Sequence, residues 1–149
     1  MKKILSLPYI FVLVLSLMLV GCQGGETVKI GTLLDKTGDL GSYGPPMEVG
    51  ADLAIQLLQD AGMDIVKVPG DSGTANQKSI AEATRLIDIE GVSAIVGSLS
   101  SGVTMATATA VTIPKDIPIM SPASTSPAIS TMADNDTVFR STVSDAAQG

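Results

Sequence analysis

The sequence predicts an α/β fold: a parallel sheet with helices on both faces. Short β-rich apolar segments alternate with segments of helical periodicity, and 45% of the 149 residues are hydrophobic, which is normal for a globular chain. Repeated strand–helix–strand units make parallel strands, because each helix carries the chain back to the edge where the previous strand began. Such a sheet is covered on both faces, and this length corresponds to about one domain.

The first predicted unit is a strand followed by a long helix. Residues 28–34 are β-rich and mostly apolar, and a Gly-rich loop follows over residues 38–44. Pro45 and Pro46 suit the first turn of a helix, and Gly62 suits its end. Apolar residues recur along this helix at helical spacing: Met47, Ala51, Ala54, Leu58 and Ala61.

The next unit repeats this order. A second strand is expected over residues 64–68, and Pro69 is expected to shorten it. Residues 74–77 have the pattern of a capping box, which predicts that a helix begins there, and Gly91 closes it. One face of this helix is apolar, with Ile80, Ala83 and Ile87. Residues 93–97 form the third expected strand.

Residues 103–112 allow two interpretations. Their period-two alternation and four Thr residues favour a strand. However, the strand over residues 93–97 needs a crossover to reach a parallel neighbour, and only this segment is available. We therefore predict a helix, which Pro114 ends. Two further strands are expected, over residues 117–120 and 138–140.

The last segment, residues 144–149, begins like a capped helix. Ser144 suits the N-cap and Asp145 lies in the first turn. The segment stops after about one turn, and an isolated turn is not stable. We therefore expect the chain to be a fragment that stops where a helix begins.

Composition argues against several classes of function. The chain has 9 basic and 15 acidic residues, no His and one Cys, which gives a net charge of −6. Without His it lacks the most common general acid–base group and metal ligand, and one Cys forms neither an internal disulfide nor a zinc cluster. An acidic chain without a basic run does not suit nucleic acid. We expect no enzyme, no metal, no cofactor and no nucleic-acid partner.

The N-terminus has the pattern of a secretory signal. Lys2 and Lys3 precede residues 4–20, which carry no charge. A transmembrane anchor is the alternative, since 17 residues reach the low end of the spanning range of ~17–25. Pro8 counts against a regular anchor helix.

The single cysteine, Cys22, directly follows Leu-Val-Gly. This arrangement resembles the lipobox of bacterial lipoproteins. The resemblance implies that residues 1–21 are a signal peptide and that Cys22 accepts the lipid. It also implies that residues 22–27 are a tether to the membrane and that the protein is exported, on the periplasmic or cell-surface side.

Three loops are expected at the carboxyl ends of the strands, where parallel α/β sheets bind ligands. They cover residues 38–44, 97–102 and 121–127, and the last two are rich in small hydroxyl residues. Ser100 and Ser101 lie where the third helix begins, and free N–H groups there favour an anion. Hydroxyl groups add donors, which points to a carboxylate. The plainer interpretation is that these residues only cap the helix and fill turns.

Several segments, in this order and spacing, resemble the type I periplasmic binding proteins, most of all the branched-chain amino-acid (Leu/Ile/Val) binding proteins of ABC importers. The segments are Lys29-Ile30-Gly31, Thr37-Gly38, Ser42-Tyr43-Gly44, Ile95-Val96-Gly97, Ser100-Ser101, residues 119–125 with Pro127, Phe139-Arg140 and Ser144-Asp145. The resemblance implies a two-lobed fold that closes on its ligand, of which residues 28–149 are an incomplete N-terminal lobe.

The resemblance also implies roles for single residues. Ser101 is expected to hold the ligand carboxylate through its hydroxyl and amide, with Ser100 beside it. Thr125 is expected to contact the same ligand head, and Ala123 to offer its carbonyl to the ammonium. Tyr43 is expected to border the ligand side chain, although an exposed loop tyrosine is the plainer alternative. Permease and ATPase subunits are the implied partners.

Two other classes of function remain open at this stage. A dinucleotide enzyme needs Gly-x-Gly-x-x-Gly after the first strand, whereas Gly38, Gly41 and Gly44 are spaced by three. A ligand-sensing ectodomain of the same fold is the stronger alternative. Adjacent permease and ATPase genes would favour transport, a histidine kinase gene would favour sensing, and turnover of the ligand would reveal an enzyme.

Overall fold

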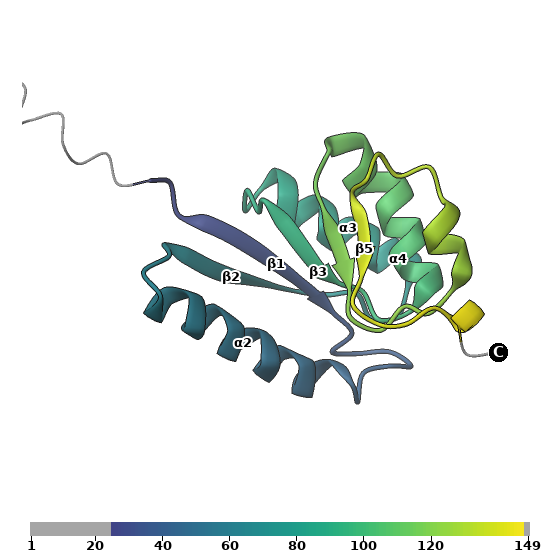
Figure 1. Cartoon of the computed structure of the whole chain (residues 1–149), viewed down its shortest axis with the longest axis horizontal. Coiled ribbons are helices and arrows are strands. Elements are labelled where there is room, and N and C mark those ends of the chain that lie inside the picture. The colour runs from purple at the N-terminus through teal and green to yellow at the C-terminus, as the bar shows by residue number, and fades with distance from the viewer. Residues whose placement is uncertain (1–24, 148–149) are drawn as a thin grey trace, which may run out of the picture.

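Five parallel strands form the centre of the molecule, in the spatial order β2-β1-β3-β4-β5 (Figure 1). The computed structural model describes residues 25–147. The strands are β1 (Val28–Leu34), β2 (Ile65–Asp71), β3 (Ala94–Gly97), β4 (Ile119–Ser121) and β5 (Val138–Arg140). All four pairings are parallel, so the carboxyl ends of the strands share one edge of the sheet. The predicted fold class is confirmed.

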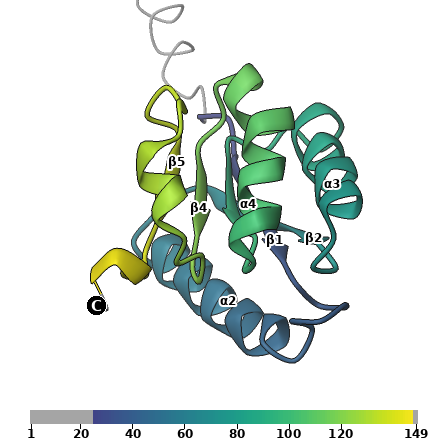
Figure 2. The same cartoon turned by 90° about the vertical axis from the view of Figure 1, so that its right-hand side faces the viewer.

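Helices cover both faces of the sheet, as expected (Figure 2). One face carries α2 (Gly44–Asp60), and the other carries α3 (Asn76–Asp88) and α4 (Ser101–Thr107). The chain continues from α4 through a π-helical turn and a 3-10 turn that ends at Lys115. Residues 103–112 are therefore helical, because they form the crossover between β3 and β4. Two further 3-10 turns are Pro127–Thr131 and Asp145–Ala147.

The hydrophobic core lies between the sheet and the layer of α3 and α4. Successive side chains of β1 point to opposite faces. Leu33 packs with Leu86 of α3 in the core, whereas Thr32 donates a hydrogen bond to Glu48 of α2. The other buried core residues are Ala83, Val92, Ile95, Ala108, Val111, Ile119, Ile129 and Val138.

The α2 face is more open. Of the apolar residues predicted along this helix, Met47 and Ala51 are half-buried, whereas Ala54, Leu58 and Ala61 are exposed. Other apolar side chains on this face are also exposed: Val49, Leu53 and Leu57 on α2, Met120 on β4 and Phe139 on β5. The helix makes its main contacts with the sheet on β1 and β2.

Three local predictions differ from the structure. Pro69 does not shorten the second strand, which continues to Asp71, because β2 is an edge strand and a missing N–H is tolerated there. The capping box does not form either. The helix has Ala75 at its N-cap without a side-chain bond, and Thr74 Oγ1 instead accepts the N–H of Leu40 at 3.0 Å. The fourth strand begins at Ile119 rather than at residue 117.

Candidate functional site

The loops after β1, β2 and β3 are joined at the carboxyl edge of the sheet by one buried carboxylate. Asp35 is fully buried, and its Oδ1 accepts the hydroxyl of Ser72 at 2.5 Å and the N–H of Leu99 at 3.1 Å. Its Oδ2 has no hydrogen-bond partner among the described residues. Asp35 therefore holds the loop that leads to Ser101 against the ends of two other strands.

A second carboxylate, Asp71, fixes the start of the Gly-rich loop. It accepts the N–H groups of Lys36 (2.9 Å) and Thr37 (3.2 Å), the Thr37 hydroxyl (2.7 Å) and the ammonium of Lys78 (2.5 Å). Partial burial acts to raise its pKa, but the bonds from Lys78, Thr37 and the backbone hold the pKa of Asp71 well below its usual range. The folded loop therefore favours the ionised form of this carboxylate.

Two glycines allow the loops to approach one another so closely. Gly38 has a φ of +80°, and a Cβ added there would lie 2.0 Å from the carbonyl oxygen of Gly73. Gly97 has a φ of +138°, and a Cβ there would lie 2.2 Å from the carbonyl oxygen of Leu33. Any other residue would push the loops apart at these two points.

The structure brings Ser101 and Thr125 together. Ser101 Oγ accepts the N–H of Thr125 at 3.1 Å and the N–H of Ser126 at 3.2 Å. A hydroxyl accepts two hydrogen bonds and donates one, so the proton of Ser101 is left to donate elsewhere. Ser100 is the N-cap of α4, and its side chain makes no capping bond. Of the plainer interpretation, helix capping does not describe the contacts of Ser101, whereas turn filling agrees with its two bonds to the loop after β4.

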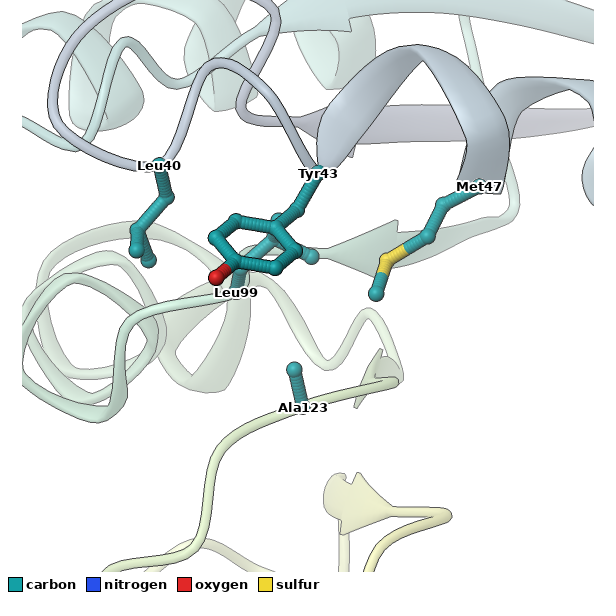
Figure 3. A pocket seen from close by; sticks show the side chains of 5 residues that line it. All are labelled: Leu40, Tyr43, Met47, Leu99 and Ala123. Atoms are coloured by element: carbon teal, nitrogen blue, oxygen red, sulfur yellow. The ribbon is translucent and has the colours of Figure 1, made fainter.

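Tyr43 and Ala123 line one pocket at this edge, with a volume of about 230 Å³. Leu40, Met47 and Leu99 complete the lining. Figure 3 shows the Tyr43 ring between the side chains of Leu40 and Met47, with the Ala123 methyl group pointing toward them. Tyr43 is 58% exposed, so one side of the ring is open to solvent. The lining carries no charged group, and the pocket suits an apolar part of a ligand.

Sequence reasoning missed the role of the three apolar lining residues and of Asp35, and it considered Asp71 only as an acid that could bind the ribose of a dinucleotide. Leu40, Met47 and Leu99 have no signal that separates them from core residues. Asp35 and Asp71 bind groups that are distant in the sequence, by up to 64 residues, so local patterns carry no trace of them. Their position directly at strand ends is the one signal that could have been used.

We searched residues 25–147, which the structure describes, for a metal site and for a membrane-spanning helix. Within this range no group of His, Cys, Asp and Glu is arranged to hold a metal ion. None of the described helices combines the length and apolar character that crossing a membrane requires. Cys22, the proposed signal peptide and the first part of the tether lie outside the described residues.

Comparison with known proteins agrees with this geometry. The family model described as periplasmic binding protein matches residues 27–149. A Leu/Ile/Val-binding protein homolog 7 from Brucella abortus is 38% identical over 79 residues, which are 50% of this chain and 20% of that protein.

Two solved structures share the fold. The branched-chain amino acid transporter substrate binding protein LivJ from Streptococcus pneumoniae, in complex with isoleucine, has a TM-score of 0.74 and 29% identity, over 80% of this chain and 35% of that one. A solute binding protein of an ABC transporter from R. palustris, in complex with benzoate, has a TM-score of 0.69 and 28% identity. The match covers 80% of this chain and 33% of that one.

The chain thus spans about a third of the length of these solved relatives. The family match covers nearly all of the described residues, and the parallel sheet with its loops at one edge is what the solved relatives share with it. The chain belongs to the type I periplasmic binding proteins, and the relatives that it resembles include branched-chain amino-acid binding proteins.

Proposed function

We propose that this chain supplies part of the substrate-binding component of an ABC importer for branched-chain or related amino acids. The observation that carries the proposal is the combination, at one sheet edge, of a hydroxyl with a free proton and an uncharged apolar pocket. Ser101 provides the first, and Tyr43 with Ala123 lines the second. Such a pair fits a small molecule with a carboxylate at one end and an apolar body at the other.

Each group has a defined part in this proposal. The Ser101 hydroxyl donates to the ligand carboxylate, and the two amides that it accepts from Thr125 and Ser126 fix its orientation. Ala123 offers its backbone carbonyl to the ammonium group. The ligand side chain enters the pocket and removes the exposed face of Tyr43 from water. No step breaks a covalent bond, so the proposed role is binding and not catalysis.

The related structures support this class of ligand. LivJ was solved with isoleucine and the R. palustris protein with benzoate. Both ligands carry a carboxylate on an apolar body, which is the chemistry that Ser101 and the pocket offer. An ammonium distinguishes the first from the second, so the carbonyl of Ala123 is the group expected to separate amino acids from aromatic acids.

The test is titration of a two-lobed protein. Residues 27–149 replace the matching segment of LivJ, and binding of L-isoleucine, benzoate and L-isoleucinamide is measured by isothermal titration. Ser101→Ala should weaken isoleucine binding about 10- to 150-fold, since a charge-assisted hydrogen bond contributes ~1.5–3 kcal/mol. Ser93→Ala, an exposed serine before β3 at the opposite edge, is the control and should bind as the parent does.

Three results would contradict the proposal. If Ser101→Ala binds isoleucine as tightly as the parent, this hydroxyl does not hold the carboxylate. If L-isoleucinamide binds as tightly as L-isoleucine, the pocket is right but the assignment of Ser101 to the ligand carboxylate is wrong. Hydrolysis or other turnover of a bound ligand would show an enzyme instead.

The proposed location follows from the family and from the N-terminal pattern. A periplasmic binding protein acts outside the cytoplasm, and we propose that lipid on Cys22 keeps this one at the membrane. Cys22→Ala should abolish incorporation of a radioactive fatty acid and leave the protein either uncleaved or released. Equal labelling of parent and variant would contradict the anchor.

A further inference from the structure

Three buried hydroxyl groups lie directly behind the two loops that carry the proposed site. Thr104 on α4, Ser121 at the end of β4 and Ser124 in the loop after β4 are each 0% exposed. We refer to these three residues as the hydroxyl cluster. A ligand at the sheet edge does not reach them, and the function proposed above gives them no part.

Ser124 is the centre of the hydroxyl cluster. Its Oγ lies 2.7 Å from Ser121 Oγ and 2.9 Å from Thr104 Oγ1, and its backbone N–H donates to Ser121 Oγ at 3.0 Å. Each hydroxyl has one proton to donate and can accept two hydrogen bonds, so the three oxygen atoms form one connected group that runs from Ser121 through Ser124 to Thr104. The loop after β4 is thereby fixed to helix α4.

The hydroxyl cluster also holds the neighbouring loop. The carbonyl of Ser98 accepts from Ser121 Oγ at 2.5 Å and lies 3.1 Å from Thr104 Oγ1, and the carbonyl of Leu99 accepts from Ser124 Oγ at 3.2 Å. Both carbonyls follow β3, where the ladder to neighbouring strands has ended. Buried carbonyls need partners, and the hydroxyl cluster provides them just before Ser101.

We propose that Ser124, with Thr104, is a positioning residue that sets the distance between the two ligand-binding loops. The inference rests on the function proposed above, because it gives the positioned groups their purpose. Ser124 lies between Ala123 and Thr125, and Thr125 donates its N–H to Ser101. A movement of Ser124 therefore displaces the Ala123 carbonyl and removes an amide from Ser101 in the same step.

The chain offers a closely matched pair of variants. Thr104→Val and Thr107→Val make the same change three residues apart on α4, at two side chains that are both 0% exposed. Thr104 bonds to Ser124 at 2.9 Å, and Thr107 bonds to Ser79 of α3 at 2.6 Å. Thr104→Val leaves the buried hydroxyl of Ser124 without this partner, and Thr107→Val does the same to Ser79. Only Ser124 belongs to a loop of the proposed site.

Amide hydrogen exchange in the full chain is the first measurement. Thr104→Val and Ser124→Ala should speed exchange at the amides of Thr125 and Ser126 by about tenfold. Thr107→Val should leave these amides unchanged, and Thr104→Ser, which keeps the hydroxyl, should restore them. Exchange in β1 and β2 reports whether each variant is folded. Equal effects of Thr104→Val and Thr107→Val on the two amides, or no effect of either, would overturn the proposal.

Binding of L-isoleucine to the two-lobed chimera with LivJ, carrying the same substitutions and followed by isothermal titration, is the second measurement. The dissociation constant should rise about tenfold in Thr104→Val and stay unchanged in Thr107→Val. If the parent binds and Thr104→Val binds equally well, positioning is wrong while the binding function stands. If exchange responds as expected but the parent binds no isoleucine, the loops are positioned as proposed and the binding function is wrong.

Discussion

The two faces of the sheet are held by different interactions. Between the sheet and α3 and α4, apolar side chains such as Leu86 and Ile95 are fully buried. On the other face α2 meets the sheet through Glu48, which accepts from Thr32 (2.9 Å) and Lys67 (2.5 Å), and its apolar side chains Leu53 and Leu57 are exposed. One sheet thus has a face stabilised by burial and a face fixed by polar contacts. The two faces should respond differently to mutation and pH.

The largest expected effect compares two leucines on opposite faces. Leu86→Ala removes a side chain that is 0% exposed in the core and should lower the free energy of unfolding by about 2–5 kcal/mol. Leu57→Ala removes one that is 60% exposed and should change it by less than about 0.5 kcal/mol. Urea unfolding followed by circular dichroism measures both. Similar losses would mean that α2 is packed as tightly as α3.

The next effect tests the polar contacts of α2. Glu48→Ala leaves the Thr32 hydroxyl and the Lys67 ammonium without this partner and should cost about 1–3 kcal/mol. Glu82→Ala, in a half-buried ion pair with Arg85 on α3 that is more accessible to solvent than Glu48, is the control and should cost less than about 1 kcal/mol. Urea unfolding distinguishes the two variants. Equal costs would show that Glu48 does not fix α2 to the sheet.

A smaller effect depends on pH. The pKa of Asp71 in the folded chain lies below the unfolded value of about 3.9. Its contribution to stability is therefore complete above that value and is lost as the pH falls through the folded pKa. Stability of the parent should fall below about pH 4, and Asp71→Asn should make the fall shallower. Unfolding curves at pH 2 to 7 measure this, and equal slopes for both proteins would contradict it.

A further effect is expected at high pH, where Lys67 beside α2 titrates. Partial burial acts to lower the pKa of Lys67, but its bonds to Asp52 and Glu48 outweigh this and raise it. The stability from this raised pKa is present below the unfolded value of about 10.4 and is lost as the pH rises above it. Lys67→Met should remove this loss, whereas Lys115→Met, an exposed pair with Asp88, should keep it. Unfolding at pH 8 to 11 makes the comparison.

The smallest effect on stability is expected from the exposed apolar side chains. Leu53→Gln combined with Leu57→Gln should leave the melting temperature within a few degrees of the parent, since both side chains are mostly in water. Solubility should rise and binding of a hydrophobic dye should fall. Unchanged dye binding would place the accessible apolar surface elsewhere.

The sequence predicted the fold class and most of the elements because hydrophobic periodicity and the alternation of strands with helices are local signals. Residues 103–112 carry a strand-like alternation, yet the need for a crossover correctly made them helical. Pro69 misled the prediction because a sequence does not show that a strand lies at an edge. The capping box failed because Thr74 bonds to Leu40, 34 residues earlier, and no local pattern reveals such a competitor.

The site was predicted in part. The pairing of Ser101 with the loop that contains Thr125, and of Tyr43 with Ala123 in one pocket, agrees with the loops expected at the carboxyl edge. The buried hydroxyl groups could not be foreseen, because serines such as Ser124 look the same in a turn and in a network. Only the folded chain shows which hydroxyl groups are buried.

The buried carboxylate of Asp35 also links the site to the assembly of the sheet. It joins a hydroxyl 37 residues away and an amide 64 residues away. Contacts of such separation close large loops and form after local structure. Both bonds exist only when β2 and β3 lie beside β1, because Ser72 follows β2 and Leu99 follows β3. The geometry around Asp35 therefore depends on the pairing of all three strands.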